Sequence, residues 1–407
     1  MSVTSQNATR TVPGSGVLRS GAGRALSGAF FAQGFSIAAV FTTVPAVRQH
    51  FGLSTTAVTV LLVGVSLAAG AGSFLGPPML RQYGDRAATR LAVLGLATAL
   101  LLIAGAPARP AVIGGYLLFG LALGGLDVTV NTRAAALERH HGRSVFATFY
   151  ACAGAAGILA ALGTAGTTGA GWTFRGTLAA AAAVVVLLSL AQRGPGRTAE
   201  TVSPAPGAAG PAGRAVWVRL LPLGGVLMCV YVIDSTVSAW TTVYLHQALH
   251  ATLSTAPFAY AAYQAGTLLG RSLGDGVVRR LGPVPVVCAF ALLAALGLAG
   301  LALAPGWVPA VPAAGTAGLG ASVLIPLTVA AAGRLWPDAP DAVLARLNVF
   351  NYAGVVTGGA LSGLLGSGGH FRLAYALPAC AAVLLPLAAP CFAVRGARLR
   401  PGGSGEG

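Results

Sequence analysis

Twelve long apolar runs, separated by short polar stretches, constrain the fold of this chain more than any other feature. They lie at about 25–47, 55–79, 91–106, 111–132, 145–167, 174–192, 219–245, 255–277, 284–304, 308–332, 347–366 and 373–394. A helix needs about 20 apolar residues to cross the hydrocarbon of a bilayer. Only 8% of the residues are charged, whereas soluble domains carry about 25%. The sequence therefore predicts an all-α integral membrane protein with twelve transmembrane helices.

The basic residues predict how these helices are oriented. All 25 are arginines, and they lie in short stretches between apolar runs, so the net charge of +16 reflects membrane topology and not a nucleic-acid partner. If both termini are cytoplasmic, 21 arginines fall on the cytoplasmic side, and the other side holds only Arg48, Arg109, Arg175 and Arg372. We therefore expect a multi-pass protein of the cytoplasmic membrane with both termini inside.

Six apolar runs precede, and six follow, a long interior stretch without a large apolar cluster. This stretch, RGPGRTAETVSPAPGAAGPAGRA, is rich in Pro, Gly and Ala and is expected to be a cytoplasmic linker. The predicted organisation is an N-terminal tail at 1–24, a six-helix half at 25–192, the linker at 193–218, a second six-helix half at 219–394 and a C-terminal tail at 395–407. Two halves that both begin and end in the cytoplasm can be parallel repeats.

A repeat is visible at an offset of 198 residues. LGPPMLRQYG (75–84) follows the second run and LGDGVVRRLG (273–282) follows the eighth. The offset superposes Gly76 on Gly274, Leu80 on Val278, Arg81 on Arg279, Gly84 on Gly282 and Gly120 on Gly318. Pro77 stands opposite Asp275, so the first copy lacks the acid of the second.

These stretches resemble the major facilitator superfamily. GRSLGDGVVRRLG (270–282) resembles its loop motif as it occurs in bacterial permeases related to the fucose permease, and LDVTVNTRAAALERHHGR (126–143) and DSTVSAWTTVYL (234–245) resemble the fourth-span end and the seventh span of that branch. The resemblance implies two pseudo-symmetric six-helix halves in a bacterial membrane. It also implies gate residues, which here are Arg271, Asp275, Gly274, Arg279, Gly282, Gly76, Arg81 and Gly84. The fifth span lacks the Gly-Pro signature of drug antiporters.

Asp234 lies near the middle of the run 219–245. A charged carboxylate at the bilayer centre costs roughly 3 kcal/mol on insertion scales, so intramembrane acids usually face a polar interior and serve function. Asp234 is therefore a candidate for proton coupling and for binding solute hydroxyls, although it could also serve structure alone. Asp127 and Asn131 are four residues apart and share one helix face. Asp127 is a second candidate proton carrier, or a cap at the end of its helix.

Arg271 and Asp275 are also four residues apart, at the end of the eighth run. Such a pair predicts a latch at a helix seam, because charged pairs there can have two arrangements. The alternative is a solvated pair worth less than about 1 kcal/mol.

Polar side chains inside the runs should point into the bundle, because hydrocarbon offers them no partner. Amides and phenols suit a small polar ligand, or they join helices. The candidate solute-binding residues are Asp234, Trp240, Gln33, Asn131, Tyr150, Tyr260, Tyr263, Gln264, Asn351 and Tyr352.

The sequence thus predicts a secondary transporter that moves a small solute by alternating access and is driven by protons. Import of a sugar-like or small polar solute is favoured slightly over efflux of a drug or secondary metabolite, and a membrane scaffold or sensor is a remote alternative. No cofactor, metal or catalytic set is expected, since the six histidines lie near run ends and the five cysteines lie in apolar runs. The expected partners are the solute, protons and lipid, and the protein is expected to be a monomer.

Overall fold

The protein is helical throughout the part of the chain that the structure describes, residues 20–141, 146–190, 214–335 and 340–393 of a computed structural model. Most of both predicted tails and of the predicted linker lies outside these residues.

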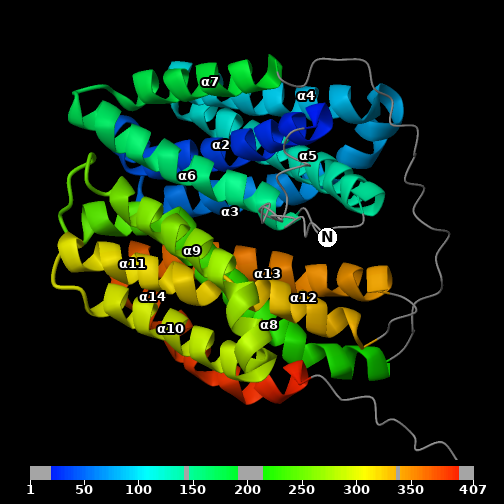
Figure 1. The fold of residues 1–407 in the computed structure, drawn as a ribbon. Coiled ribbons are helices and arrows are strands. Elements are labelled where there is room, and N and C mark those ends of the chain that lie inside the picture. Colours follow the sequence, from blue (N-terminus) through cyan, green and yellow to red (C-terminus); the bar gives the residue numbers. More distant parts are fainter. Residues whose placement is uncertain (1–19, 142–145, 191–213, 336–339, 394–407) are drawn as a thin grey trace, which may run out of the picture.

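Two groups of helices lie against each other (Figure 1). The N-terminal half contains α2 (Gly21–Phe51), α3 (Thr55–Ser73), α4 (Gly76–Gly105), α5 (Arg109–His141), α6 (Phe146–Gly169) and α7 (Phe174–Leu190). The C-terminal half contains α8 (Arg214–Gln247), α9 (Pro257–Leu281), α10 (Pro283–Leu303), α11 (Trp307–Ala321), α12 (Leu324–Gly333), α13 (Pro340–Ser367), α14 (Phe371–Leu384) and a 3-10 helix η1 (Leu385–Phe392).

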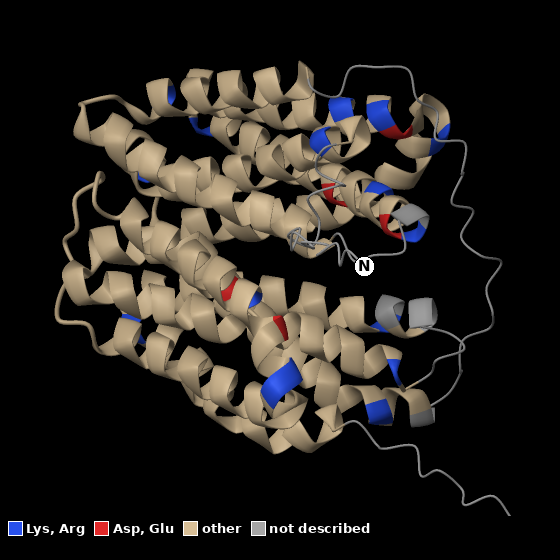
Figure 2. Cartoon of the chain, in the orientation of Figure 1, with Lys and Arg blue, Asp and Glu red and all other residues tan. Residues whose placement is uncertain are grey.

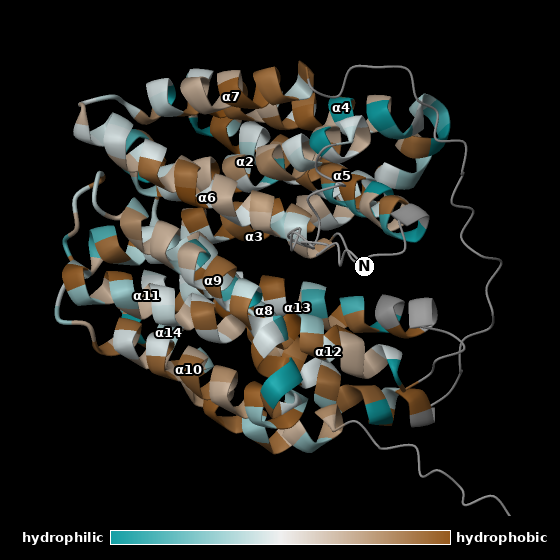
Figure 3. Ribbon diagram, in the orientation of Figure 1, coloured by the Kyte–Doolittle hydropathy of each residue, from teal (hydrophilic) through white to brown (hydrophobic). Residues whose placement is uncertain are grey.

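Each predicted run corresponds to one helix or to two consecutive helices. Within the described ranges, ten segments are long and apolar enough to span a bilayer, and α7 is a shorter apolar helix. Figure 3 shows apolar residues along most of the helical lengths, with hydrophilic residues gathered near one end of the bundle. The predicted class, an all-α membrane protein of two six-helix halves, is confirmed.

The repeat seen in the sequence recurs in the backbone. Gly84 interrupts α4 at φ 76°, ψ 167°, and Gly282 separates α9 from α10 at φ 82°, ψ 166°. A positive φ of this kind favours glycine, which has no Cβ to clash. The matching glycines of the two halves therefore make the same bend.

Similar side-chain contacts recur in the two halves near the opposite end of the bundle, between arginines 197 residues apart and alanines 198 residues apart. Arg175 donates from Nη2 to the carbonyl oxygen of Ala106 at 2.9 Å, and Arg372 donates from Nη2 to that of Ala304 at 3.3 Å. Each arginine satisfies a carbonyl left without an intrahelical partner just beyond a helix C-terminus.

Helix boundaries differ from the sequence expectation in three places. The stretches 75–84 and 273–282, which the loop motif of the family led us to expect between helices, are helical instead: the first is largely the first turns of α4, and the second is the end of α9 with Gly282. The run 308–332 is broken between α11 and α12, because Pro326 has no N–H to donate to the carbonyl of Ser322. The run 373–394 ends as a 3-10 helix that contains Pro386 and Pro390.

Two ends of the bundle differ in charge (Figure 2). Figure 2 shows most of the blue residues near the end of the bundle where α4 begins and α5 ends, which we call the Arg-rich end. The Arg-poor end holds Arg48, Arg109, Arg175 and Arg372. The halves pack together along a seam formed by α6 with α9, α3 with α13, and α2 with α8.

Candidate functional site

Asp127 on α5 lies at the centre of a polar cluster in the N-terminal half. Gln33 on α2 donates from Nε2 to its Oδ1 at 3.0 Å, and the side chain of Asn131 also hydrogen-bonds to it. Tyr150 on α6 donates its hydroxyl proton to Oδ1 of Asn131 at 3.2 Å. Three helices therefore contribute to one hydrogen-bonded chain, and the shared face of Asp127 and Asn131 is the one that the sequence predicts.

Asp234 on α8 is the matching acid of the C-terminal half. Tyr263 on α9 donates its hydroxyl proton to Oδ1 of Asp234 at 2.8 Å, and the Tyr263 side chain is buried. A hydrogen bond to a charged acceptor is stronger than a neutral one, so Tyr263 can stabilise the ionised form of Asp234.

Arg271 and Tyr231 bring these two clusters into electrostatic range of each other across the seam. The guanidinium carbon of Arg271 lies 5.8 Å from the centroid of the Tyr150 ring, and its charge interacts with Asp234. Tyr231 on α8 is half-buried and lies near both Asp127 and Asp234. Tyr231 is not among the predicted site residues, although it lies three residues before Asp234 and so close to it on the helix surface.

The two acids differ in exposure. Asp127 is exposed although it lies within α5 and bonds to the buried Gln33, and Asp234 is half-buried. The carboxyl of Asp127 thus accepts a hydrogen bond from a buried side chain while the residue keeps an accessible surface.

Some predicted solute-binding residues lie apart from these clusters. Trp240 is fully buried in the C-terminal half, with its ring centroid 6.5 Å from that of Phe371. On α13, Tyr352 is exposed and Asn351 is half-buried, and no hydrogen bond joins either to the clusters in the described ranges. These three are therefore not brought to the acids in this conformation.

Tyr260 and Gln264 lie where α9 packs against the N-terminal half. Tyr260 is buried in a cluster with Ala38 and Ala161, and Gln264 lies against Gly157. Both residues thus belong to the seam.

The predicted gate residues lie toward the Arg-rich end. Gly76 and Gly274 are buried under Val128 and Val323, respectively. Arg81, Asp275 and Arg279 are exposed. Among the residues described, no hydrogen bond or ion pair joins Arg271 to Asp275, so the latch predicted between them stays a prediction.

In the first half, the stretch opposite Asp275 has no acid at Pro77, and Asp85 follows the Gly84 bend. Asp85 interacts electrostatically with Arg133, and Arg133 donates from Nη1 to Oγ1 of Thr89 at 2.9 Å. A gate role for Asp85 and Arg133 stays a prediction.

A hydrogen bond joins the two halves at the Arg-poor end. Nε2 of Gln49 on α2 lies 2.6 Å from Nε2 of His246 on α8, and Nδ1 of His246 lies 2.7 Å from the carbonyl oxygen of Ala251. Because a carbonyl only accepts, Nδ1 carries the proton, and Nε2 accepts from the Gln49 amide. Neither Gln49 nor His246 is among the residues that the sequence predicts to be functional.

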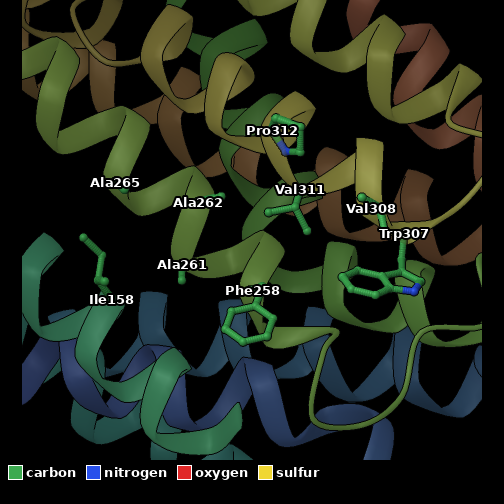
Figure 4. A pocket seen from close by; sticks show the side chains of 9 residues that line it. All are labelled: Ile158, Phe258, Ala261, Ala262, Ala265, Trp307, Val308, Val311 and Pro312. Atoms are coloured by element: carbon green, nitrogen blue, oxygen red, sulfur yellow. The ribbon is translucent and has the colours of Figure 1, made fainter. Parts of the chain in front are cut away.

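Two cavities lie away from the acids. One of about 480 Å³, between α6, α9 and α11, is lined by apolar side chains such as Ile158, Phe258 and Val311 (Figure 4). The other, of about 350 Å³ at the Arg-poor end, is lined in part by Thr43, Gln49 and other polar residues. The first cavity has no charged residue in its lining, so it is not the site formed by the clusters around Asp127 and Asp234.

Comparison with known proteins identifies the family. The Major Facilitator Superfamily profile matches residues 26–316 and 223–406, which together cover most of the chain. The chain belongs to the major facilitator superfamily. This transporter is 28% identical over 367 residues to an uncharacterised MFS-type transporter of Yersinia pestis, a match that covers 88% of this chain and 91% of the relative. It is 25% identical over 344 residues to membrane protein MosC of Rhizobium meliloti, covering 82% and 81%, respectively.

Solved structures of MFS transporters share the fold of this transporter. A point mutant of the nucleoside transporter NupG superposes with a TM-score of 0.74 at 14% identity, covering 91% of this chain and 99% of that one. The D-xylose-proton symporter superposes with a TM-score of 0.71 at 15% identity, covering 91% and 97%. At such identities the likeness concerns the fold alone, and the resemblance to the fucose-permease branch stays a prediction.

Proposed function

We propose that this transporter couples the movement of a small polar solute to protons, with Asp234 as the main proton carrier and Asp127 as the second. One observation carries the proposal. Each half contributes one carboxyl to a hydrogen-bonded polar cluster, Asp127 with Gln33 and Asp234 with Tyr263, and Arg271 of the C-terminal half lies over the ring of Tyr150 of the N-terminal half. A rearrangement of the halves against each other changes the surroundings of both carboxyls at once.

The cost of charge inside a membrane gives the physical basis of coupling. An ionised carboxylate that turns into a dry interior costs several kcal/mol, whereas its protonated form costs much less. Consider an acid that is exposed to water on one side of the membrane in one state and on the other side in the next state. The conformational change between the two states is therefore easier when the acid is protonated. A solute that binds only one protonation state is then linked to the proton gradient.

The chemistry of the clusters favours a hydroxylated solute. Gln33, Asn131 and Tyr150 supply donors and acceptors, and each carboxyl can accept from solute hydroxyls. Two structural neighbours are a nucleoside transporter and a D-xylose-proton symporter, and both solutes carry hydroxyl groups. We propose uptake toward the Arg-rich end, which the distribution of arginines assigns to the cytoplasm.

The test is transport by the wild-type protein in proteoliposomes, with radiolabelled D-xylose, D-glucose and uridine as probes. We expect at least one probe to accumulate above its outside concentration when the outside is more acidic, and a protonophore to abolish the accumulation. Equal uptake with and without the gradient would contradict proton coupling. Extrusion driven by the gradient would favour the efflux alternative.

A further inference from the structure

Within the described residues, the side chain of Arg271 forms no hydrogen bond or ion pair with Asp275, its partner in the predicted gate. It lies on α9 four residues before Asp275, so both side chains project from one face of the helix. In this conformation the guanidinium lies instead over the ring of Tyr150, which belongs to α6 of the other half, with 5.8 Å from Cζ to the ring centroid. A cation within about 6 Å of an aromatic ring is attracted to its face.

Tyr150 connects this cation to the acid of the N-terminal half. Its hydroxyl donates to Asn131, and the Asn131 side chain hydrogen-bonds to Asp127. The ring face of Tyr150 therefore meets Arg271, while the hydroxyl extends a hydrogen-bonded chain to Asp127.

Arg271 also interacts with the acid of its own half. Its charge acts on Asp234, on Tyr263, which donates to Asp234, and on Tyr231. Of the other helices packed on α9, α11 has no titratable side chain in Trp307–Ala321 and α10 has only Cys288, whereas α2 carries Arg24, Arg48 and His50 toward its ends. Arg271 is thus placed between the two acid clusters.

We infer that Arg271 is a positioning residue with two alternative places, over Tyr150 across the seam and on Asp275 along its own helix. In the state described here it joins the halves near the Arg-rich end and links Asp127 to Asp234 through Tyr150. When α6 and α9 separate at that end, Arg271 pairs with Asp275. The inference rests on the proposed proton coupling for its role in transport, but the two-place contact itself does not depend on that coupling.

The contact can be tested by the distance between the halves, without any solute. Spin labels replace Phe74, an exposed residue at the end of α3, and Leu281, an exposed residue at the end of α9, in a protein whose five native cysteines are replaced by alanine. Pulsed electron paramagnetic resonance in nanodiscs then gives the populations of the two states.

Pairs of substitutions distinguish the effect of the Tyr150 ring from that of its hydroxyl. Tyr150→Leu and Arg271→Gln should each change the population ratio by about two- to fivefold, the effect of losing an exposed cation–π contact. Tyr150→Phe keeps the ring and should stay near the wild-type ratio, and Arg271→Lys should restore most of what Arg271→Gln loses. Asp275→Asn removes the alternative partner and should shift the ratio in the opposite direction.

The outcomes distinguish the role of Arg271 from the proposed proton coupling. Wild-type ratios in both Arg271→Gln and Tyr150→Leu, or equal effects of Tyr150→Phe and Tyr150→Leu, would overturn the contact. If the population ratios change as expected while wild-type transport does not depend on a pH gradient, the contact between Arg271 and Tyr150 is supported and the proposed proton coupling is refuted. If a pH gradient drives transport and the ratios do not move, the coupling stands and the role of Arg271 falls.

Discussion

The hydrogen bond between Gln49 and His246 should hold the Arg-poor end of the bundle closed. It joins α2 to α8 at 2.6 Å, and the bond from His246 to Ala251 fixes which ring nitrogen accepts. A typical hydrogen bond contributes a net 0.5–1.5 kcal/mol, and because Gln49 is exposed we expect about 0.5–1 kcal/mol. Removing it should therefore shift the equilibrium toward the state open at that end by about two- to fivefold.

A double-mutant cycle isolates this bond from other effects. Gln49→Ala, His246→Ala and the double variant would be compared by pulsed electron paramagnetic resonance, with labels at the exposed positions Leu102 of α4 and Leu303 of α10. We expect each single variant to populate a longer distance and the double variant to add little, because the bond is lost once. Effects of the two singles that simply add in the double would refute the reasoning, since residues without a shared contact are additive.

Three further predictions concern packing, the acid of the C-terminal half and topology. Gly72→Val should lower the free energy of unfolding by about 1–3 kcal/mol, since its side chain would meet the backbone of Leu121, and a lower melting temperature in detergent would show it. Tyr263→Phe should reduce proton-driven transport about tenfold, because a hydrogen bond to a charged group is worth about 1.5–3 kcal/mol, and unchanged transport would show that the bond is dispensable. A reporter fused after Gly407 should read cytoplasm, whereas one inserted near His250 should read the outside, and the reverse pattern would overturn the arginine-based orientation.

Much of the fold could be predicted because it depends on length and hydropathy. The cost of exposing backbone groups to hydrocarbon forces each long apolar run into a helix, and ten segments of the described residues are long and apolar enough to span a bilayer. The repeat could be recognised in the sequence because Gly84 and Gly282 make the same bend. The helix break before Pro326 could not be recognised, because a proline inside an apolar run hardly changes the mean hydropathy of that run.

Only those features of the site that depend on positions within a single helix could be predicted from the sequence. At about 100° per residue, Trp240 lies about 120° around α8 from Asp234, whereas Tyr231 lies about 60° away. This simple rotation could have favoured Tyr231, which lies near both acids, over Trp240, which packs in the core. The partners that Gln33 and Tyr263 find on other helices depend on helix packing, which one helix's sequence does not specify.

The most direct test of the proposed coupling compares exchange with accumulation in Asp234→Asn. Asparagine keeps the size of the side chain and its capacity to hydrogen-bond, but it cannot carry a proton. In proteoliposomes containing a probe that the wild-type protein accumulates, the variant should still exchange labelled for unlabelled probe across the membrane, yet no longer concentrate it under an imposed pH gradient. Accumulation at the wild-type level, with the same dependence on pH, would contradict the role of Asp234 as the proton carrier.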